Sequence, residues 1–578
     1  MTRSIERRAS AADASILSDA LHPVLDRMYR NRGLRSSQEL DTSLKSLAPA
    51  STLLGIDGAV ELLVQALQAQ QRVLIVGDFD ADGATATTLA VLGLRAMGFA
   101  QVDFLVPNRF EFGYGLTPEI VAVAAAQSPD LLITVDNGIS SIDGVAAARE
   151  AGIAVLVTDH HLPAEQLPDA NAIINPNQGG CSFPSKHLAG VGVMFYVLAA
   201  LRSRLVADGH FERSAQPVPN VAQWLDLVAL GTVADVVALD QNNRILVEQG
   251  IRRIRAGQCR PGISALLRAG RRDPQRCVAS DLGFAAGPRL NAAGRLSDMR
   301  AGIECLLNDD EGECSRMAAQ LDALNRARRD IEADMQREAL ASMQGVLDGI
   351  VDLPYGVCLF QEHWHQGVVG IVASRVRERV HRPVIAFARE GEGTLKGSAR
   401  SIPGLHIRDA LDAVAAANPG LLLKFGGHAM AAGLSLNDQD LQTFSSAFNT
   451  QLQRLLQPGD LDDVLRTDGP LEEVELNLEL ARTLRAGGPW GQAFPEPLFD
   501  GEFDVLSRRI VGEKHLKMSL SAATDSAAID AIAFNITDED WPAGARRIHA
   551  AYRLDVNDYQ SRESVQLVIE WLEVVSQA

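Results

Sequence analysis

Short apolar runs alternate with longer stretches of helical character through the first half of the chain. The runs at 73–77, 131–135 and 154–158 are built almost wholly from aliphatic residues and Thr, and Ala-rich segments at 121–127 and 143–151 stand between them. Strands that are apolar on both faces and separated by helices are typical of a parallel sheet covered on both sides. The pattern from about residue 55 to 215 therefore predicts a parallel α/β domain.

A long amphipathic segment and a second alternating region follow. Apolar residues recur at helical spacing over 311–344, with charged residues on the opposite faces, which predicts one long helix. Such a helix is either a rigid strut between two lobes or an ordinary surface helix. Strand-like runs at 357–360 and 384–387 then flank a helical segment at 371–379, which predicts a second α/β lobe.

The last part of the chain has a different texture. From about residue 460 it holds short β-type pieces at 503–505, 516–520, 529–534 and 565–571. An all-β module of this size is either an OB-type barrel or a small sandwich. With 578 residues the chain is too long for a single core. The predicted organisation is a helical lead-in at 1–50, a first α/β domain at 51–310, a connecting helix at 311–345, a second α/β domain at 346–452 and a β module at 453–578.

Charge and cysteine content narrow the functional classes. A formal net charge of −19 is unusual for a nucleic-acid-binding protein, but arginines cluster at 252–255 and 268–276, and binding depends on the local field. The six cysteines form no Cys-x-x-Cys pair, which argues against a zinc ribbon or disulfide framework and fits a reducing cytoplasm. The N-terminus lacks a signal-peptide pattern, and the longest apolar stretch, at 190–201, is too short to span a bilayer. We therefore expect a cytoplasmic protein with no membrane association.

Metal-ligand side chains follow the first apolar run. Asp78, Asp80 and Asp82 alternate directly after 73–77. In extended geometry alternate side chains point the same way, and three crowded carboxylates repel one another unless cations neutralise them. Hard divalent cations such as Mg²⁺ or Mn²⁺ suit such a site, although a solvated acidic turn is the simpler alternative.

The next two apolar runs end in similar chemistry. Asp136 follows the second run within Asp-Asn-Gly, and Asp159, His160 and His161 follow the third. The carboxyl ends of strands are where open α/β sheets place their sites. Imidazole together with carboxylates suits Mn²⁺ or Zn²⁺. Because the chain has no Gly-x-Ser-x-Gly and no glycine-rich phosphate loop, the cluster predicts hydrolysis by metal-activated water.

These motifs resemble those of a known superfamily. The Asp-x-Asp-x-Asp-Gly run from Asp78, the Asp-Asn-Gly from Asp136 and the Asp-His-His from Asp159 are similar to the first three motifs of the DHH phosphoesterase superfamily, and 231–235 is similar to its fourth. From about residue 50 to the C-terminus, further segments resemble the RecJ family of this superfamily. These segments are Pro107–Arg109, Gly113–Gly115, Gly287–Arg295, Trp364–Gly367, Lys396–Arg400 and Gly426–His428.

The resemblance implies a fold and an activity. A DHH domain would be joined by the long helix to a DHHA1 domain and followed by an OB-type barrel. The implied activity is that of a single-stranded-DNA 5′→3′ exonuclease, which releases 5′-mononucleotides by two-metal-ion hydrolysis with two Mn²⁺ or Mg²⁺ ions in DNA recombination and repair. The implied partners are a 5′-ended single strand, a single-strand-binding protein and a RecQ-type helicase, and we expect a monomer.

Two other classes share the superfamily's motifs. Oligoribonucleases and cyclic-dinucleotide phosphodiesterases of this kind are typically shorter and lack an OB-like module, whereas this chain continues well beyond the second lobe. Non-catalytic DHH-derived binding proteins lose metal ligands, and here the expected set is complete.

The resemblance also assigns the metal site. The implied ligands are Asp78, Asp80, Asp82, Asp136, His160 and Asp235. Asp136 would bridge the two ions, Asp159 would orient an imidazole, and His161 would face the scissile phosphate. Without the resemblance, Asp235 is a lone Asp in a helical stretch, where such a residue is often only a cap or a surface group.

Other residues are implied to bind the substrate. They are Arg109, Arg289, Arg295, His365, Ser398, Arg400, Gly426, Gly427 and His428. Arg109, Ser398 and Arg400 match positions that hold a 5′-terminal phosphate, for which the planar guanidinium fork is well suited. Arg289 and Arg295 would contact the DNA backbone. The Gly-Gly-His segment offers amides and a donor to a phosphate or is a turn beside a core His, and His365, next to Trp364, either stacks on a base or packs. In the β module, the candidates for DNA contact are Lys514, His515, Lys517, Tyr552 and Tyr559.

Overall fold

The computed structural model describes residues 4–8, 17–107, 115–343, 353–427, 429–512, 515–523, 527–534, 536, 545–559 and 562–577. Two of the predicted site residues, Arg109 and His428, lie outside these ranges. The chain divides into two compact units. The large unit contains Arg7–Asp322 and Arg466–Ala578, and the small unit contains Met1–Glu6 and Ala323–Leu465.

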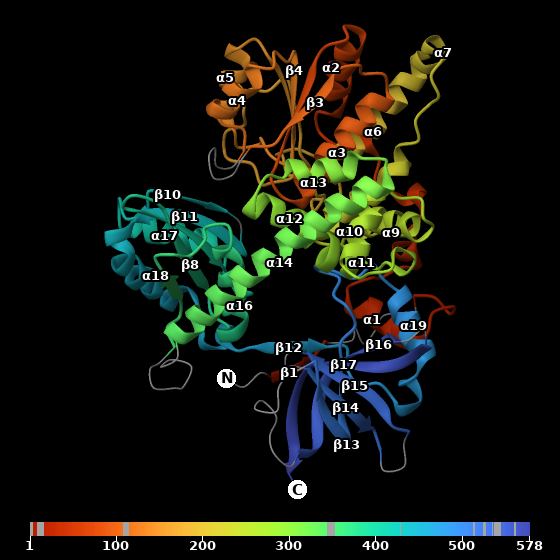
Figure 1. Ribbon diagram of the computed structural model, residues 1–578, viewed down its shortest axis with the longest axis vertical. Helices are drawn as coiled ribbons and strands as arrows, with labels where there is room; N and C mark the ends of the chain where they lie inside the picture. The colour runs from red at the N-terminus through yellow and green to blue at the C-terminus, as the bar shows by residue number, and fades with distance from the viewer. Residues whose placement is uncertain are drawn as a thin grey trace. The chain divides into compact units, whose positions relative to one another are not determined.

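A five-stranded parallel sheet organises the N-terminal part of the large unit (Figure 1). Its strand order is β3-β2-β4-β5-β6. The strands are β2 (Val73–Gly77), β3 (Val102–Leu105), β4 (Leu131–Val135), β5 (Ala154–Thr158) and β6 (Ala172–Ile174). Apolar side chains of β2, β4 and β5 pack on one face against α4 (Pro118–Ala125) and α5 (Ile142–Glu150). Helices α2 (Ile56–Gln68), α3 (Ala81–Ala96) and α6 (Gly190–Ala207) contact the sheet as well, which confirms the predicted parallel α/β domain.

Helix α6 is longer than the apolar stretch seen in the sequence. It is the one single helix among the described residues that is long and apolar enough to cross a membrane, with a mean hydropathy of 1.5. A second candidate arises only if Leu44–Thr52 and Ile56–Gln68 are taken together through an 85° bend. However, 61% of α6 is buried inside the protein, where it packs against α2, α3 and α8 (Leu225–Ala234). Its apolar character is therefore that of a core helix.

A helical layer completes this part of the large unit. Its members are α7 (His210–Ser214), α8, α9 (Gln241–Arg255), α10 (Pro261–Ala269), α11 (Ala279–Asp281), the π-helix η6 (Leu282–Ala286), α12 (Gly287–Leu296) and α13 (Arg300–Leu307). Helix α8 ends sooner than the predicted helical stretch, so Asp235 becomes its C-cap residue. The long helix α14 (Glu311–Ser342) follows, as its amphipathic pattern predicts, and continues into the small unit.

The small unit is a second α/β lobe, as predicted. Its sheet has the order β10-β11-β9-β8-β7, in which only β7 and β8 are parallel. The strands are β7 (Val357–Phe360), β8 (Val384–Gly391), β9 (Thr394–Arg400), β10 (Lys424–Gly427) and β11 (Ala431–Asn437), and the helices are α16 (Val369–Val380), α17 (Ile407–Ala417) and α18 (Leu441–Leu455). Helix α18 runs across the predicted domain boundary at 452. The domain boundaries as such stay predictions.

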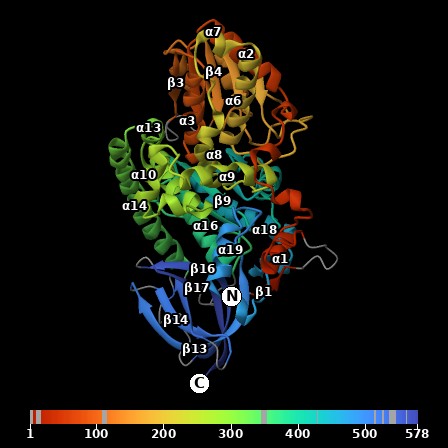
Figure 2. The same cartoon turned by 90° about the vertical axis from the view of Figure 1, so that its right-hand side faces the viewer.

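The C-terminal module is a closed five-stranded barrel, which decides between the two architectures that the sequence left open (Figure 2). The order is β13-β14-β15-β17-β16. The strands are β13 (Phe499–Val511), β14 (His515–Ser521), β15 (Ile529–Phe534), β16 (Ala545–Tyr559) and β17 (Arg562–Gln577). Strand β16 was absent from the predicted pieces, although its apolar residues alternate with Arg, Asp and Asn in the pattern of a half-buried strand. Helix α19 (Leu478–Ala486) packs on β16.

The prediction of a helical lead-in over residues 1–50 is largely wrong. Among the described residues of this segment, only α1 (Pro23–Asn31) is an α-helix; 3₁₀ turns follow it, and β1 (Ser4–Arg7) pairs with β12 (Val464–Thr467). The polar residues of this segment find partners from the far end of the chain. The Arg32 guanidinium forms a buried ion pair with Asp468, 2.9 Å long, and lies over the ring of Trp490. A sequence pattern cannot show contacts between residues so far apart.

Candidate metal centre

Neighbouring strands deliver the predicted ligands to one edge of the parallel sheet. Gly77 of β2 is in register with Val135 of β4, and Val135 is in register with Thr158 of β5. The residues that follow these strand ends are therefore neighbours in space. Asp80 is also the N-cap of α3, and its Oδ1 accepts a hydrogen bond from the Gly83 N–H at 3.0 Å.

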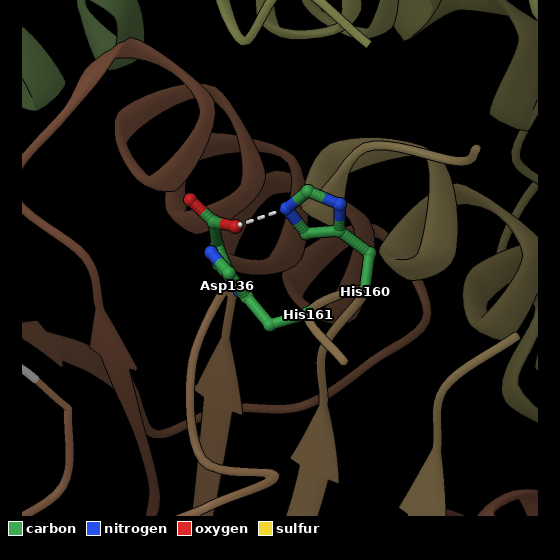
Figure 3. Close-up of side chains that lie close together, drawn as sticks. All are labelled: Asp136, His160 and His161. Atoms are coloured by element: carbon green, nitrogen blue, oxygen red, sulfur yellow. Dashed lines mark ion pairs between the residues drawn. The ribbon is translucent and has the colours of Figure 1, made fainter. Parts of the chain in front are cut away.

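Six side chains form two adjoining groups of three at this edge. One group contains Asp78, Asp80 and Asp136, and the other contains Asp82, His160 and Asp235; in each group the ligand atoms lie within 4.8 Å of one another. The His160 Nε2 lies 3.0 Å from Asp136 Oδ1 (Figure 3). It also lies 3.4 Å from Asp235 Oδ2, so the two groups adjoin. All six predicted metal ligands are thus brought together, including Asp235 from the end of α8.

The carboxylates of this cluster are strongly crowded. Asp82 and Asp136 are buried, with exposed fractions of 0% and 2%. Burial, and next the charge of Asp235, raises the pKa of Asp82 to about 7. Burial and then the charge of Asp80 raise the pKa of Asp235 to about 7, and burial and the neighbouring carboxylates raise that of Asp136 as well. Cations between the two groups would relieve this repulsion.

The donor set fits hard or borderline divalent cations. Burial, and then the positive charge of His161, lowers the pKa of His160 and keeps its imidazole neutral, which is the form that binds metal. Five carboxylates with one neutral imidazole suit Mn²⁺ or Mg²⁺, and no cysteine belongs to any of the groups.

Asp159 is committed to positioning rather than to metal binding. Its Oδ1 accepts hydrogen bonds from the backbone N–H groups of His160 and His161 and lies 2.7 Å from His161 Nδ1, while its Oδ2 accepts from the Ile139 N–H. Burial opposes the charge of His161, but the hydrogen bond and ion pair with Asp159 outweigh it and raise the pKa of His161 to about 9. Burial likewise opposes the charge of Asp159, and the same contact lowers its pKa to about 2. His161 is therefore an imidazolium whose ring is held by Asp159.

Other residues hold the ligand loops in ways that sequence reasoning missed. The backbone N–H groups of Gly190 and Val191, at the start of α6, donate to the two carboxylate oxygens of Asp82 at 2.6 and 3.0 Å. A Cβ at Gly190 would lie 2.6 Å from Asp136 Cβ, so only glycine fits this approach. The sequence showed no signal for this contact, because α6 lies more than a hundred residues after Asp82.

Helix α12 closes on the first ligand loop from another side. Asn291 Oδ1 accepts a hydrogen bond from the Ala81 N–H at 2.8 Å. A Cβ at Gly294 would collide with the carbonyl oxygen of Phe79. Asn291 and Gly294 both belong to the motif at 287–295, in which only the two arginines were predicted to contact the substrate.

Comparisons with known proteins agree over the whole chain. Residues 72–232 match the DHH family, N-terminal domain; residues 352–454 match the DHHA1 domain; and residues 467–571 match the RecJ OB domain. Relatives named single-stranded-DNA-specific exonuclease RecJ are 54% identical in Salmonella typhimurium and 53% identical in Escherichia coli, each over 98% of both chains. The chain belongs to the RecJ family. A crystal structure of RecJ from Thermus thermophilus in complex with Mn²⁺ is 30% identical, has a TM-score of 0.78 and covers 96% of this chain and 76% of that one.

Membership of the RecJ family confirms the predicted fold of DHH domain, DHHA1 domain and OB-type barrel. Four of the predicted end-binding residues of this RecJ-family chain, Ser398, Arg400, Gly426 and Gly427, lie on the sheet of the small unit. Ser398 is in register with Gly433 of β11, which is in register with Gly426 of β10. The structure thus aligns Ser398 and Gly426 across three strands, and Gly427 follows at the end of β10.

Arg400 is a mostly buried guanidinium beside these strands. Its Nε donates to Ser374 Oγ at 3.1 Å and its Nη1 to the Ala399 carbonyl at 2.8 Å. Burial, and then the charge of Arg377, lowers the pKa of Arg400. Among the residues that the structure describes, no carboxylate pairs with it. A guanidinium held in this way can accept an anion as its partner.

The remaining predicted contacts differ in their surroundings. Arg289 is only 7% exposed, and its Nη2 pairs with Asp322 Oδ1 at 2.7 Å, so it links α12 to α14 within the large unit. This geometry fits a structural role better than the predicted DNA contact. Arg295 is half-buried one residue after Gly294.

Trp364 is buried and donates its Nε1–H to Glu338, so Trp364 packs within the protein. The Nδ1 of His365 accepts a hydrogen bond from the Gly367 N–H.

One candidate in the barrel is wrong. Tyr552 is 1% exposed and lies in the barrel core against Phe499 and Phe503, so it cannot stack on a base. Lys517 is paired with Asp530 at 3.0 Å, and His515 contacts the ring of Phe534. Lys514 and the side chain of Tyr559 lie outside the described residues.

Proposed function

We propose that this chain degrades single-stranded DNA from its 5′ end, releases 5′-mononucleotides and acts in DNA recombination and repair. The single observation that carries the proposal is the pair of adjoining ligand groups at the carboxyl ends of β2, β4 and β5. The relatives that share its full length are single-stranded-DNA-specific exonucleases by name, and RecJ of Thermus thermophilus has been crystallised with Mn²⁺ and with Mg²⁺. The chain is accordingly a metal-dependent nuclease.

Each ligand group would hold one divalent cation. Asp78, Asp80 and Asp136 would hold one, and Asp82, His160 and Asp235 the other, and Asp136 Oδ1 lies 3.0 Å from His160 Nε2 of the second group. Two Mn²⁺ or Mg²⁺ ions held by these residues would activate water and stabilise charge on the phosphodiester. The backbone N–H groups of α6 fix the orientation of Asp82, and Asn291 fixes the loop that carries Asp80.

His161 would bind the scissile phosphate as a cation. Asp159 is the partner of its Nδ1, and the Nε2–H would be the donor toward a phosphate oxygen. The raised pKa keeps this proton in place through neutral pH.

The 5′ polarity would come from the small unit. Arg400 and Ser398 would hold the terminal 5′-phosphate, and Gly426 and Gly427 would let the phosphate approach the backbone. The roles of Arg109 and His428 stay predictions from the resemblance. Support comes from Arg400 itself, which has no carboxylate partner among the described residues and lies beside the Ser374 hydroxyl. Arg295 would contact the DNA backbone nearer the metal ligands.

The predicted setting of the enzyme belongs to this proposal as well. It comprises a single-strand-binding protein and a RecQ-type helicase as partners, a monomeric state and a cytoplasmic location. Neither the fold nor the site tests these four predictions.

The proposed activity is tested by identifying the product. A single strand of DNA, a blunt duplex and a single strand of RNA are incubated with the protein and Mn²⁺, and the products are separated by chromatography. We expect 5′-mononucleotides from single-stranded DNA and little release from the duplex. Preferred release from short RNA or from a cyclic dinucleotide would place the chain with the oligoribonuclease or cyclic-dinucleotide phosphodiesterase class instead.

A further inference from the structure

An exposed aromatic ring on the π-helix of the large unit has no role in the site described so far. Phe284 is 77% exposed, while most residues around it in η6 and at the start of α12 are buried. Single exposed apolar residues are normal on protein surfaces, so the position of this ring decides whether it serves a contact. π-helical turns are rare, and they occur frequently at functional sites.

The packing of η6 fixes where this ring lies. On one side, a Cβ at Gly283 would lie 3.2 Å from Val233, and a Cβ at Gly287 would lie 3.1 Å from Ala234, the residue before Asp235. On another side, Ala285 packs against Gly270 at the end of α10. A Cβ added to Gly270 would lie 2.8 Å from the Cβ of Ala285. Phe284 therefore occupies the remaining open side, on a helix turn that is packed against the end of α8.

The helix that follows Phe284 reaches the metal ligands. Helix α12 begins directly after η6, and its Asn291 accepts a hydrogen bond from the Ala81 N–H in the loop between Asp80 and Asp82. At a rise of at most about 1.5 Å per residue, Phe284 lies within roughly 10 Å of that contact along the helix axis. A strand whose phosphate is at the ligand loop can reach the ring with its next nucleotides.

Free cations stand close to the ring on this acidic protein. Arg268 lies two residues before Gly270, and Arg271 directly follows it; Gly270 packs against Ala285. The side chains of both arginines are exposed. Over the described part of the chain, neither guanidinium forms an ion pair. An aromatic platform for a base together with cations for the backbone is the usual composition of a single-strand-binding surface.

We propose that Phe284 stacks on a nucleobase of the substrate strand close to the scissile phosphate, with Arg268 and Arg271 neutralising the phosphates beside it. The inference rests on the proposed function and adds a substrate-positioning residue to it. Such stacking requires an unpaired base, so Phe284 would contribute to the preference for single strands.

The test compares Phe284→Ala and Phe284→Trp with a control at another exposed apolar residue. Val474→Ala is the control, because Val474 is also 77% exposed and belongs to the same unit. Loss of a base-stacking ring costs about 1–3 kcal/mol. We therefore expect Phe284→Ala to raise the KM for oligothymidylate about tenfold to hundredfold with a smaller change in kcat. Phe284→Trp should restore the KM, and Val474→Ala should leave it unchanged.

A spectroscopic readout separates stacking from a structural role. In an Asp136→Ala background, which does not cleave, a strand with 2-aminopurine near its 5′ end should lose fluorescence on binding, and adding Phe284→Ala should abolish this quenching. A strand with an abasic site at the stacked position should show no penalty from Phe284→Ala. An unchanged KM, failure of Trp to rescue it, or an equal penalty on the abasic strand would overturn the inference. If the unsubstituted protein itself fails to cleave single-stranded DNA with Mn²⁺, the proposed function fails instead.

Discussion

At the scale of single residues, Asp159 and His161 form a pair whose contribution to stability depends on pH in a defined way. The pKa of His161 is about 9 against an ordinary 6.5, so its contribution is complete below pH 6.5 and is lost as pH rises through 9. The pKa of Asp159 is about 2 against an ordinary 3.8, so its contribution is present above pH 3.8 and is lost as pH falls through 2. The pair should therefore stabilise the metal-free fold most between these two ordinary values.

This window predicts the effect of Asp159→Asn. The free energy of unfolding, measured with urea on metal-free protein, should fall most near pH 5 and least above pH 9. Glu165→Gln, at an exposed carboxylate, is the control and should show no such profile. A loss of stability that is constant from pH 4 to 10 would contradict the assigned charges of the pair.

Removing a ligand carboxylate should separate catalysis from stability. Asp136→Ala and Asp80→Ala should abolish cleavage and Mn²⁺ binding, because each removes a donor from the proposed site. The metal-free melting temperature should hold or rise, since the substitution relieves repulsion among crowded carboxylates. Calorimetric titration with Mn²⁺ and thermal unfolding check the two parts, and near-normal turnover by either variant would refute the ligand assignment.

Arg400→Ala tests recognition of the strand end. A charge-assisted phosphate contact contributes about 1.5–3 kcal/mol, so affinity for a 5′-phosphorylated strand should fall about tenfold to hundredfold. A strand with a 5′-hydroxyl should show a much smaller loss. Arg379→Ala, at an exposed arginine of the same unit, serves as the control. Equal losses for the two strand ends would exclude Arg400 from the phosphate site.

At the scale of elements, the position of α12 against the first ligand loop is the most exacting contact. Gly294→Ala would drive a methyl group into the Phe79 carbonyl, and overpacking of this kind costs about 1–3 kcal/mol. We expect a lower melting temperature and a lower kcat/KM, because the loop that carries Asp78 and Asp80 must move. Gly58→Ala in α2 is the matched control, since nothing lies within 4 Å of its Cβ, and it should be neutral or slightly stabilising. Full activity and stability of Gly294→Ala would refute the tight contact.

Local patterns decide which elements could be predicted. Strands β2, β4 and β5 were predictable because they are buried on both faces and end in carboxylates, and α14 was predictable from its helical spacing. Strand β16 was missed although its apolar and polar residues alternate as in a strand with one buried face. The contacts of α6 with Asp82 and of α12 with Phe79 join residues more than a hundred positions apart, so no local pattern shows them. The ligand set itself was supplied by the resemblance, and the structure supplied its grouping.

At the scale of the whole molecule, the separate β module in the sequence predicts that deletion of the chain from about residue 455 leaves a metal-dependent nuclease that binds single strands poorly. The competing view is that the tail covers apolar surface of the rest of the large unit. The structure favours the competing view, because Tyr29 packs against Trp490 and Phe494, and the buried Arg32 guanidinium is paired with Asp468. Loss of one partner of a buried ion pair costs about 3–5 kcal/mol.

We therefore expect the truncated chain to be insoluble or to unfold at a much lower temperature than the full chain. Solubility on expression and thermal unfolding measure this directly. Trp490→Ala in the full chain is a milder version and should also lower the melting temperature. A soluble truncation with an unchanged melting temperature, and with only a shallower dependence of DNA affinity on salt, would instead support the barrel as a separate DNA-binding module.

The central claim is that two divalent cations, held by the six ligands, drive removal of nucleotides from the 5′ end. It is tested most directly by digesting one single strand labelled at its 5′ end and the same strand labelled at its 3′ end, with and without Mn²⁺. With Mn²⁺, the 5′ label should appear at once as mononucleotide, while the 3′ label should remain on steadily shortening strands. Without Mn²⁺, or with Asp136→Ala, both labels should stay on the intact strand. Early release of the 3′ label, or equal cleavage without a divalent cation, would contradict the account.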